Sequence, residues 1–201
     1  MIIPIGNWVL EQVCLQIAKW QHFDELETIA ANVSSVQLTD SNFIDNVKSI
    51  LVKTNCDGKA LEIEQTESWL MDDPSVNIKI LQELKELNVT LSLDDFGTAY
   101  SSLSQLGRLP LDILKIDKSF IDDCVHNHSD HMIVRTIIQL GHNLGMKIVA
   151  EGVEYEEQRQ LLSAENCEYY QGYLFSKPVT ALELEALLIK QNEVSNLVTS
   201  L

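Results

Sequence analysis

The strongest constraint in this sequence is a regular alternation of short apolar runs with longer amphipathic stretches. Each apolar run has the length of a strand, and each amphipathic stretch repeats its apolar residues at helical spacing. Strands are predicted at residues 28–33, 60–65, 89–94, 112–117, 147–151 and 169–175. Because strands that alternate with helices run parallel in one sheet, we expect an α/β protein.

The amphipathic stretches predict seven helices around that sheet. They are expected at residues 5–21, 40–53, 74–87, a short stretch ending near residue 109, 130–144, 155–164 and 181–191. Pro74 suits the first turn of its helix, and Gly145 suits the position just after a helix end. No low-complexity linker divides the chain, so residues 1–201 are expected to form a single domain.

Six strands are compatible with two architectures, and periodicity does not choose between them. One is a doubly wound open sheet, and the other is a (β/α)₈ TIM-like barrel, which typically takes about 250 residues. This chain opens with a helix and then repeats six strand–helix units. As a barrel it would be incomplete, with about six of eight strands, and would lack the first two strands and the first helix.

Polar side chains stand at the end of each predicted strand. Taken singly, Asn32 or Asp95 has a structural explanation as the N-cap of the next helix. Taken together they suggest a site, because the carboxyl ends of parallel strands are where α/β proteins bind ligands. The residues are Asn32, Glu64, Asp94, Asp95, Lys115, Asp117, Glu151 and Gln171. Such carboxylates suit Mg²⁺ or Mn²⁺, and two such ions can clamp a phosphodiester and activate a water.

Lys115 lies within an apolar strand, in the run Ile113-Leu114-Lys115-Ile116-Asp117. A buried lysine without a partner is costly, so we expect a nearby carboxylate to pair with it. That pair is either a structural ion pair or part of the site.

The composition excludes some classes of function. A net charge of −16 offers no basic stripe for polymeric nucleic acid, although metal ions held by carboxylates can still meet a small phosphate ligand. The four cysteines form no CxxC pair and are expected to be reduced thiols. We expect no secretory leader and no membrane span, and a cytoplasmic protein.

Six motifs in this order resemble the EAL family of cyclic-di-GMP phosphodiesterases. The motifs are Asn32-Val33-Ser34, Glu64-Gln65-Thr66-Glu67-Ser68, Asp94-Asp95-Phe96-Gly97-Thr98-Ala99-Tyr100-Ser101-Ser102, Leu114-Lys115-Ile116-Asp117, Glu151-Gly152-Val153-Glu154 and Gln171-Gly172-Tyr173-Leu174-Phe175. The opening Ile3-Pro4-Ile5-Gly6-Asn7-Trp8-Val9-Leu10 is similar to the family's first long helix. Each motif alone is weak evidence for the family, but six motifs in this order are specific evidence for it.

The resemblance implies metal-dependent hydrolysis of cyclic di-GMP to the linear dinucleotide pGpG. Under it, Asn32, Glu64 and Asp94 would hold one Mg²⁺ or Mn²⁺, and Asp94, Asp95 and Glu151 the other. Lys115 would position the attacking water, Asp117 would support that network, and Gln171 would line the site. Glu67, Phe96 and Gly97 would belong to a region that couples dimerisation to activity.

Two departures from the family pattern leave the activity open. The family's Glu-Ala-Leu strand, whose Glu is a metal ligand, precedes the opening helix and is not found there in this chain. Ala99 stands where the family usually has glycine. Impaired hydrolysis is therefore expected of this chain. The alternative is a degenerate, non-catalytic EAL module that binds cyclic di-GMP or a protein partner, and a metal-using barrel of the enolase kind is a third interpretation.

The resemblance also implies partners. A homodimer is expected, and a longer parent protein could place a sensory or diguanylate cyclase domain beside this one. The absence of two barrel strands would also leave two sheet edges able to recruit other chains.

Overall fold

The sheet has six strands among the residues that the computed structural model describes, which are 1–23, 26–72, 74–98 and 106–198. The strands are β1 (Ile29–Asn32), β2 (Leu61–Thr66), β3 (Thr90–Phe96), β4 (Ile113–Ile116), β5 (Lys147–Glu151) and β6 (Tyr169–Gln171). All five neighbouring pairs are parallel, in the order β1-β2-β3-β4-β5-β6. The outer strands β1 and β6 are not paired with each other, so the sheet forms an open half-barrel. This arrangement confirms the predicted incomplete barrel.

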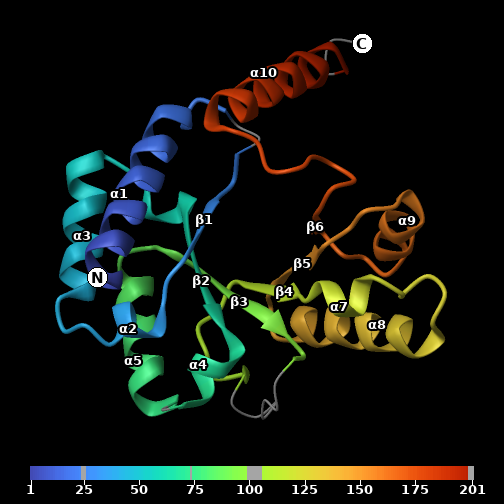
Figure 1. Cartoon of the computed structure of the whole chain (residues 1–201), viewed down its shortest axis with the longest axis horizontal. Helices are drawn as coiled ribbons and strands as arrows, with labels where there is room; N and C mark the ends of the chain where they lie inside the picture. The colour runs from blue at the N-terminus through green and yellow to red at the C-terminus, as the bar shows by residue number, and fades with distance from the viewer. Residues whose placement is uncertain (24–25, 73, 99–105, 199–201) are drawn as a thin grey trace.

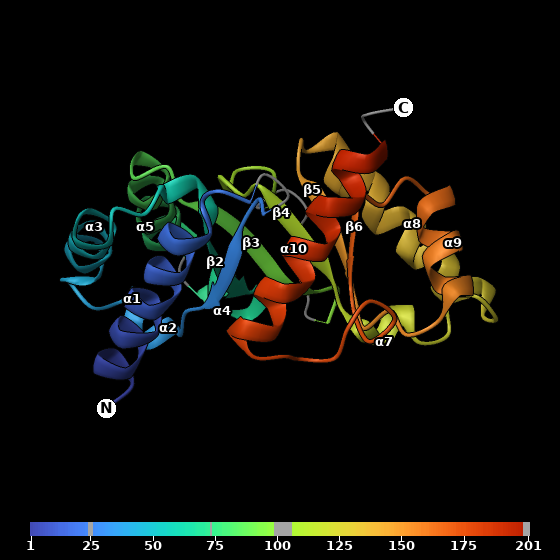
Figure 2. The ribbon, with the colours of Figure 1, turned by 90° about the horizontal axis from the view of Figure 1, so that it is seen from above.

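Most helices lie on the outer side of the curved sheet, whereas α10 lies at its open side near the end of α1 (Figures 1 and 2). They are α1 (Ile2–Trp20), α2 (Ser35–Leu38), α3 (Phe43–Thr54), η1 (Gly58–Ala60), α4 (Glu67–Asp72), α5 (Pro74–Glu86), α7 (Lys118–Ile121), α8 (His128–Asn143), α9 (Glu156–Ala164) and α10 (Ala181–Val198). Among the described parts of the chain, none of these helices combines the length and the apolarity needed to cross a membrane.

The hydrophobic core lies between the sheet and the helices because side chains alternate along each strand. Leu61 and Ile63 of β2 are almost completely buried, and so are the corresponding residues of the next strands, Leu91, Leu93, Leu114, Ile116, Ile148 and Ala150. The residues between them, such as Glu62 and Glu64, point to the inside of the half-barrel. The alternation therefore directs apolar side chains outward to the helices and polar side chains inward.

Two sets of contacts link the ends of the open sheet. Leu188 and Leu184 of α10 pack against Trp20 and Phe23, at and just beyond the end of α1. At the amino ends of the strands, Glu27 accepts hydrogen bonds from Lys147 Nζ at 2.6 Å and from the Tyr169 hydroxyl at 2.8 Å. We call these two Glu27 contacts the seam, because they join the residues before β1 to β5 and β6.

The boundaries of several elements differ from the prediction. The first helix begins at Ile2 rather than residue 5, since Pro4 is tolerated in a first turn. The last strand ends at Gln171 rather than residue 175, because the backbone turns at Gly172, whose carbonyl accepts from the N–H of Phe175. Short helices α2, α4 and α7 follow directly after strands where only loops were expected.

All four cysteines are free thiols, as predicted. The predicted short helix ending near residue 109, and the Ala99 departure, involve residues 99–105, which lie outside the described residues.

Candidate active site

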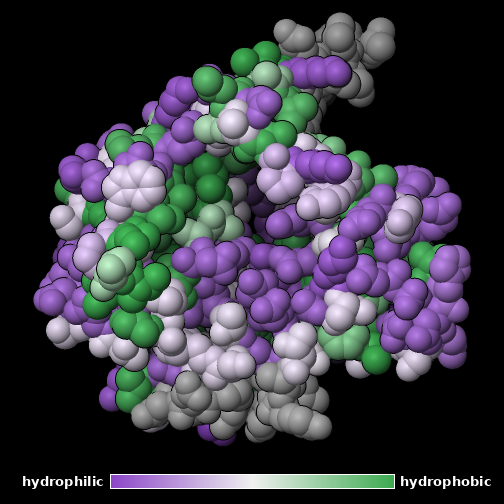
Figure 3. All heavy atoms as spheres, in the orientation of Figure 1, coloured by the Kyte–Doolittle hydropathy of each residue, from purple (hydrophilic) through white to green (hydrophobic). Residues whose placement is uncertain are grey.

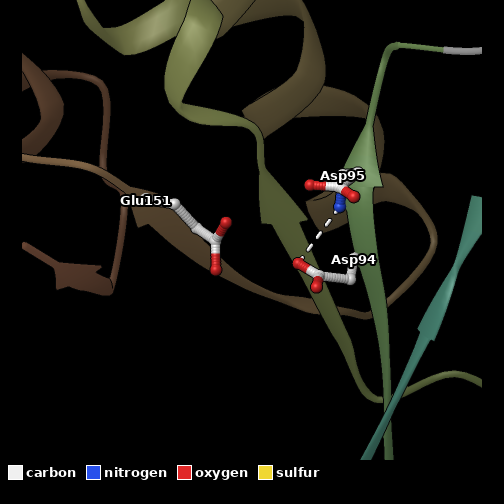
Figure 4. A group of neighbouring side chains, drawn as sticks. All are labelled: Asp94, Asp95 and Glu151. Carbon is white, nitrogen blue, oxygen red and sulfur yellow. Dashed lines mark hydrogen bonds between the residues drawn. The ribbon is translucent and has the colours of Figure 1, made fainter. Parts of the chain in front are cut away.

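Three carboxylates from two strands converge at the carboxyl ends of the sheet. Asp94 and Asp95 lie near the end of β3 and Glu151 is the last residue of β5, and one oxygen from each lies within 4.8 Å of the others. Figure 4 shows Asp94 and Asp95 facing Glu151 across the inside of the half-barrel. Hard divalent cations such as Mg²⁺ and Mn²⁺ prefer oxygen ligands, so three converging carboxylate oxygens fit such an ion.

Asp94 and Asp95 reach the same site because β3 is irregular there. In a regular strand, neighbouring side chains point to opposite faces. Here the register with β4 shifts between Leu93 and Phe96, and Asp95 adopts a left-handed conformation with φ of 55°. The backbone N–H of Asp95 donates to Asp94 Oδ1 at 3.1 Å. The bulge therefore turns the second carboxylate toward the site.

Lys115 lies at the centre of this group, and its side chain is only 5% exposed. Its Nζ is 2.6 Å from Glu64 Oε1, 2.6 Å from Glu151 Oε1 and 3.4 Å from Asp94 Oδ1. The prediction that a carboxylate pairs with this lysine is confirmed. The ammonium connects β4 to β2, β3 and β5.

Burial and charge shape the ionisation of the group. Burial raises the pKa of Glu64 and of Glu151, and Lys115 offsets part of the rise in each. Burial alone would lower the pKa of Lys115. The negative charges and hydrogen bonds of Glu64 and Glu151 have the larger effect, and they raise the pKa of Lys115 above its ordinary value. Lys115 is therefore held as an ammonium ion.

Asn32 and Gln171 come from the two edge strands. Asn32 Nδ2 donates to Glu64 Oε2 at 2.8 Å, so Asn32 is in contact with the group. Gln171 is the register partner of Glu151 and lines a cavity of about 310 Å³ together with Glu64 and Lys115. This cavity is inside the half-barrel, which Figure 3 shows as a hollow beneath α10.

Asp117 has a structural role in addition to its position near the site. Its carboxylate caps α7 by accepting from the backbone N–H of Ser119 at 3.0 Å, and it also accepts from the Ser119 hydroxyl. Burial raises the pKa of Asp95, and the charges of Asp94 and Asp117 raise it further. Asp117 is thus close enough to influence the site, and its catalytic role stays a prediction.

Glu67, Phe96 and Gly97 form a contact beside the site. Glu67 is buried, and its Oε2 accepts from the Gly97 N–H at 3.0 Å. Phe96 is buried in the core. The contact ties the end of β2 to the segment after β3, and the predicted role of these residues in dimerisation is left untested.

One residue of the site and one sequence motif elsewhere did not enter the prediction. Glu62 is buried, points inward two residues before Glu64, accepts from the Thr28 hydroxyl at 2.8 Å and helps to raise the pKa of Glu64. The alternation along β2 was the signal that could have identified it. A Glu-Ala-Leu tripeptide also occurs at residues 185–187, but Glu185 is in α10 and accepts from Trp20 Nε1 at 2.9 Å, away from the site.

The larger hollow in the molecule lies at the opposite, amino-terminal ends of the strands. It measures about 640 Å³ and is lined by residues that include Glu27, Lys85, Asp112 and Lys147. Four of the charged residues that line it form two ion pairs, Lys85 with Asp112 and Lys147 with Glu27. The converging carboxylates make the carboxyl ends the better candidate for chemistry.

Comparison with protein families identifies one match that covers most of the chain. The sequence model of the EAL domain matches residues 1–178. Signaling protein YkoW of Bacillus subtilis is 39% identical over 191 residues, which are 95% of this chain and 24% of that protein. The bifunctional diguanylate cyclase/cyclic di-GMP phosphodiesterase MucR of Pseudomonas aeruginosa is 40% identical over 187 residues, which are 92% of this chain and 27% of that protein. This chain thus spans about a quarter of the length of these relatives.

A solved structure agrees with this match. The structure of the PaMucR phosphodiesterase in complex with c-di-GMP superimposes with a TM-score of 0.86 and 40% identity, covering 91% of this chain and 74% of that one.

Proposed function

This chain belongs to the EAL domain family, and from that membership we propose that it is the larger part of a metal-dependent phosphodiesterase domain that converts cyclic di-GMP to pGpG. The observation that carries the proposal is the convergence of Asp94, Asp95 and Glu151 around Lys115 at the carboxyl ends of parallel strands. A carboxylate cluster of this kind, with a buried cation beside it, suits transfer of a phosphoryl centre to water.

The family resemblance supplies the roles of the ligands. Asn32, Glu64 and Asp94 would hold one Mg²⁺ or Mn²⁺, and Asp94, Asp95 and Glu151 would hold the second. When bound, such ions neutralise the phosphate charge and make a water nucleophilic at neutral pH.

The remaining residues would act on the substrate and the water. In hydrolysis, a water oxygen forms a bond to phosphorus, the bond from phosphorus to a ribose 3′ oxygen breaks, and that oxygen takes up a proton. Lys115, held as an ammonium ion, can donate a hydrogen bond to the water or to a non-bridging phosphate oxygen. Gln171 would contact the substrate from the edge of the cavity that it lines.

We expect hydrolysis by this chain to be weak. A polypeptide of residues 1–201 alone does not contain the family's Glu-Ala-Leu strand, and losing a group that stabilises the transition state costs a factor of about 10²–10³. Adding the first two strands and the first helix of the EAL domain of a relative such as MucR to the N-terminus should restore formation of pGpG, measured by chromatography. Equal rates for the chain with and without the addition would contradict this expectation.

A second candidate function is binding of cyclic di-GMP without turnover. It is favoured by Glu64, whose two oxygens already accept from Lys115 and Asn32. Calorimetric binding of cyclic di-GMP with no pGpG after long incubation would select this function.

Metal binding tests the site directly. Mg²⁺ or Mn²⁺ should raise the Tm of the chain, because an ion that binds only the folded state stabilises it. Asp94→Ala should abolish most of that rise, since Asp94 would contact both ions. Asp123→Ala, which removes an exposed carboxylate elsewhere, should leave the rise intact. If millimolar divalent ions do not change the Tm, the two-metal proposal is wrong for this chain.

We also propose a homodimer and, in a longer parent protein, a neighbouring sensory or cyclase domain. The neighbouring domain is supported by the length of the relatives, which are about four times as long as the part that matches, and by the name of MucR, which includes a diguanylate cyclase.

A further inference from the structure

The carboxylates of the candidate site already hold a cation that belongs to the chain itself. The Lys115 ammonium is 2.6 Å from an oxygen of Glu64 and 2.6 Å from an oxygen of Glu151. Asp94, which would be shared by both metal ions, lies 3.4 Å from the same nitrogen. The ammonium therefore occupies the junction between the two proposed metal positions.

Both carboxylate oxygens of Glu64 already accept hydrogen bonds from other side chains of this protein. One oxygen accepts from Lys115 at 2.6 Å, and the other accepts from Asn32 Nδ2 at 2.8 Å. A metal ion bound by Glu64 and Asn32 needs an oxygen from each, so the Asn32 amide must turn its carbonyl oxygen inward in place of its NH₂ group. Glu64 must also give up a hydrogen bond to one of its two donors.

Charge makes this exchange a competition. Two like charges at about 4 Å repel strongly where water is largely excluded. An ammonium in contact with Glu64 and Glu151 and a divalent ion on the same carboxylates would be neighbours at about this separation. Binding of the ion is therefore opposed as long as the lysine keeps its position.

We propose that Lys115 is an internal stand-in for a metal ion, which a divalent cation displaces from Glu64 and Glu151 when it binds. The proposal rests on the function proposed above, and it adds a cost of metal binding that is built into the site. The stand-in keeps mutually repelling carboxylates together without metal, so the site is formed in advance. The ammonium also weakens the affinity of the site for metal ions. Metal binding should therefore be favoured when substrate is bound, because the phosphate adds negative charge to the site.

Mn²⁺ titration of Lys115→Met tests the proposal. Removing the ammonium should tighten Mn²⁺ binding by about tenfold or more in calorimetry without substrate. Lys85→Met is the matched control, because Lys85 also contacts two carboxylate oxygens, of Asp112 at 2.7 and 2.8 Å, but at the other ends of the strands. It removes the same charge and should leave the Mn²⁺ affinity within about twofold.

The opposite result is equally informative. If Lys115 served to hold the ligands in place for metal, Lys115→Met would bind Mn²⁺ more weakly, and unchanged or weaker binding overturns the stand-in. If neither the unmodified chain nor Lys115→Met binds Mn²⁺, the proposed metal-dependent function fails together with it. Mn²⁺ binding by the unmodified chain with no gain in the variant rejects the stand-in alone.

A measurement on the unmodified chain covers the case in which Lys115→Met does not fold. The ¹⁵N signal of the Lys115 ammonium, assigned by its loss in Lys115→Arg, should shift on saturation with Mg²⁺. A signal that stays in place at saturating Mg²⁺ would rule out displacement. A variant that folds only when Mn²⁺ is present supports the proposal, because the metal then replaces the missing charge.

Discussion

The position of Asp95 in the candidate site depends on its backbone conformation as well as on its carboxylate. Its φ of 55° lies in the left-handed region, where Asp and Asn are more often found than other non-glycine residues. The other described non-glycine residues with positive φ are Asn55, Asn88 and Asn166. A β-branched residue at position 95 would therefore remove a proposed metal ligand and also resist the bulge that turns β3 toward Glu151.

Gly97 is the residue at which we expect backbone shape to matter most. Its φ is 98°, and an added Cβ would lie 2.8 Å from Cε2 of Phe120. Gly97→Ala should lower the free energy of unfolding by about 2 kcal/mol, from left-handed strain plus this clash. Denaturant unfolding measures the loss.

Gly145→Ala separates the two causes. Gly145 has φ of 77°, but nothing lies within 4 Å of an added Cβ. It should cost about 1 kcal/mol, from backbone strain alone. Equal losses in both variants would show that the Phe120 contact relaxes without cost.

Elements whose pattern is local could be predicted from the sequence, and those set by tertiary contacts could not. All six strands were predicted because each is a short apolar run, and their polar ends identified Glu64, Asp94, Asp95, Lys115 and Glu151 as neighbours. The short helix α7 escaped prediction because a four-residue segment has no periodicity, although Asp117 as its N-cap was a local signal. The bulge in β3 was not predictable, because it depends on pairing with β4.

The seam between the residues before β1 and the strands β5 and β6 should weaken in acid. Lys147 and Tyr169 hydrogen-bond to Glu27 and lower its pKa below the ordinary value of 4.5. A lowered carboxyl pKa contributes stability that is complete above the ordinary pKa and is lost as the pH falls through the lowered one. Glu27 is largely exposed, so Glu27→Gln should cost at most about 1 kcal/mol at pH 7. The stabilities of the two proteins should converge once the pH falls below the lowered pKa of Glu27.

Hydrogen exchange locates that effect. Glu27→Gln should speed exchange of the β6 amides at pH 7. Glu156→Gln also removes an ion-paired carboxylate, but its partner Arg159 is in the same helix, so exchange in β6 should not change. If both variants leave β6 unchanged, the seam does not hold the ends of the sheet together.

The whole molecule is expected to associate through its open side. The strands β1 and β6 are the edges of the sheet, and exposed edges pair with other chains. Phe175, just after β6, adds apolar surface with an exposure of 62%. The charge of −16 opposes association only partly, because salt screens charges beyond about 8–10 Å. Light scattering at micromolar concentration should show a dimer or a larger assembly.

A charged residue on the edge tests which surface is responsible. Tyr170→Lys places a charge on β6 and should lower the average mass. Tyr155→Lys makes the same change at an exposed tyrosine before α9 and should not. A monodisperse monomer with a cooperative melt for the unmodified chain would mean that α10 and the seam close the half-barrel by themselves.

The strand order has a consequence for how the chain acquires its structure during synthesis. Each strand pairs with the strand made just before it, so the sheet can grow in the order in which a ribosome delivers it. The bond between Glu27 and Tyr169 spans 142 residues and must wait until β6 has emerged. Until then, the nascent chain carries Glu64, Asp94 and Lys115 on an unfinished sheet, and the site is completed only by late-arriving Glu151.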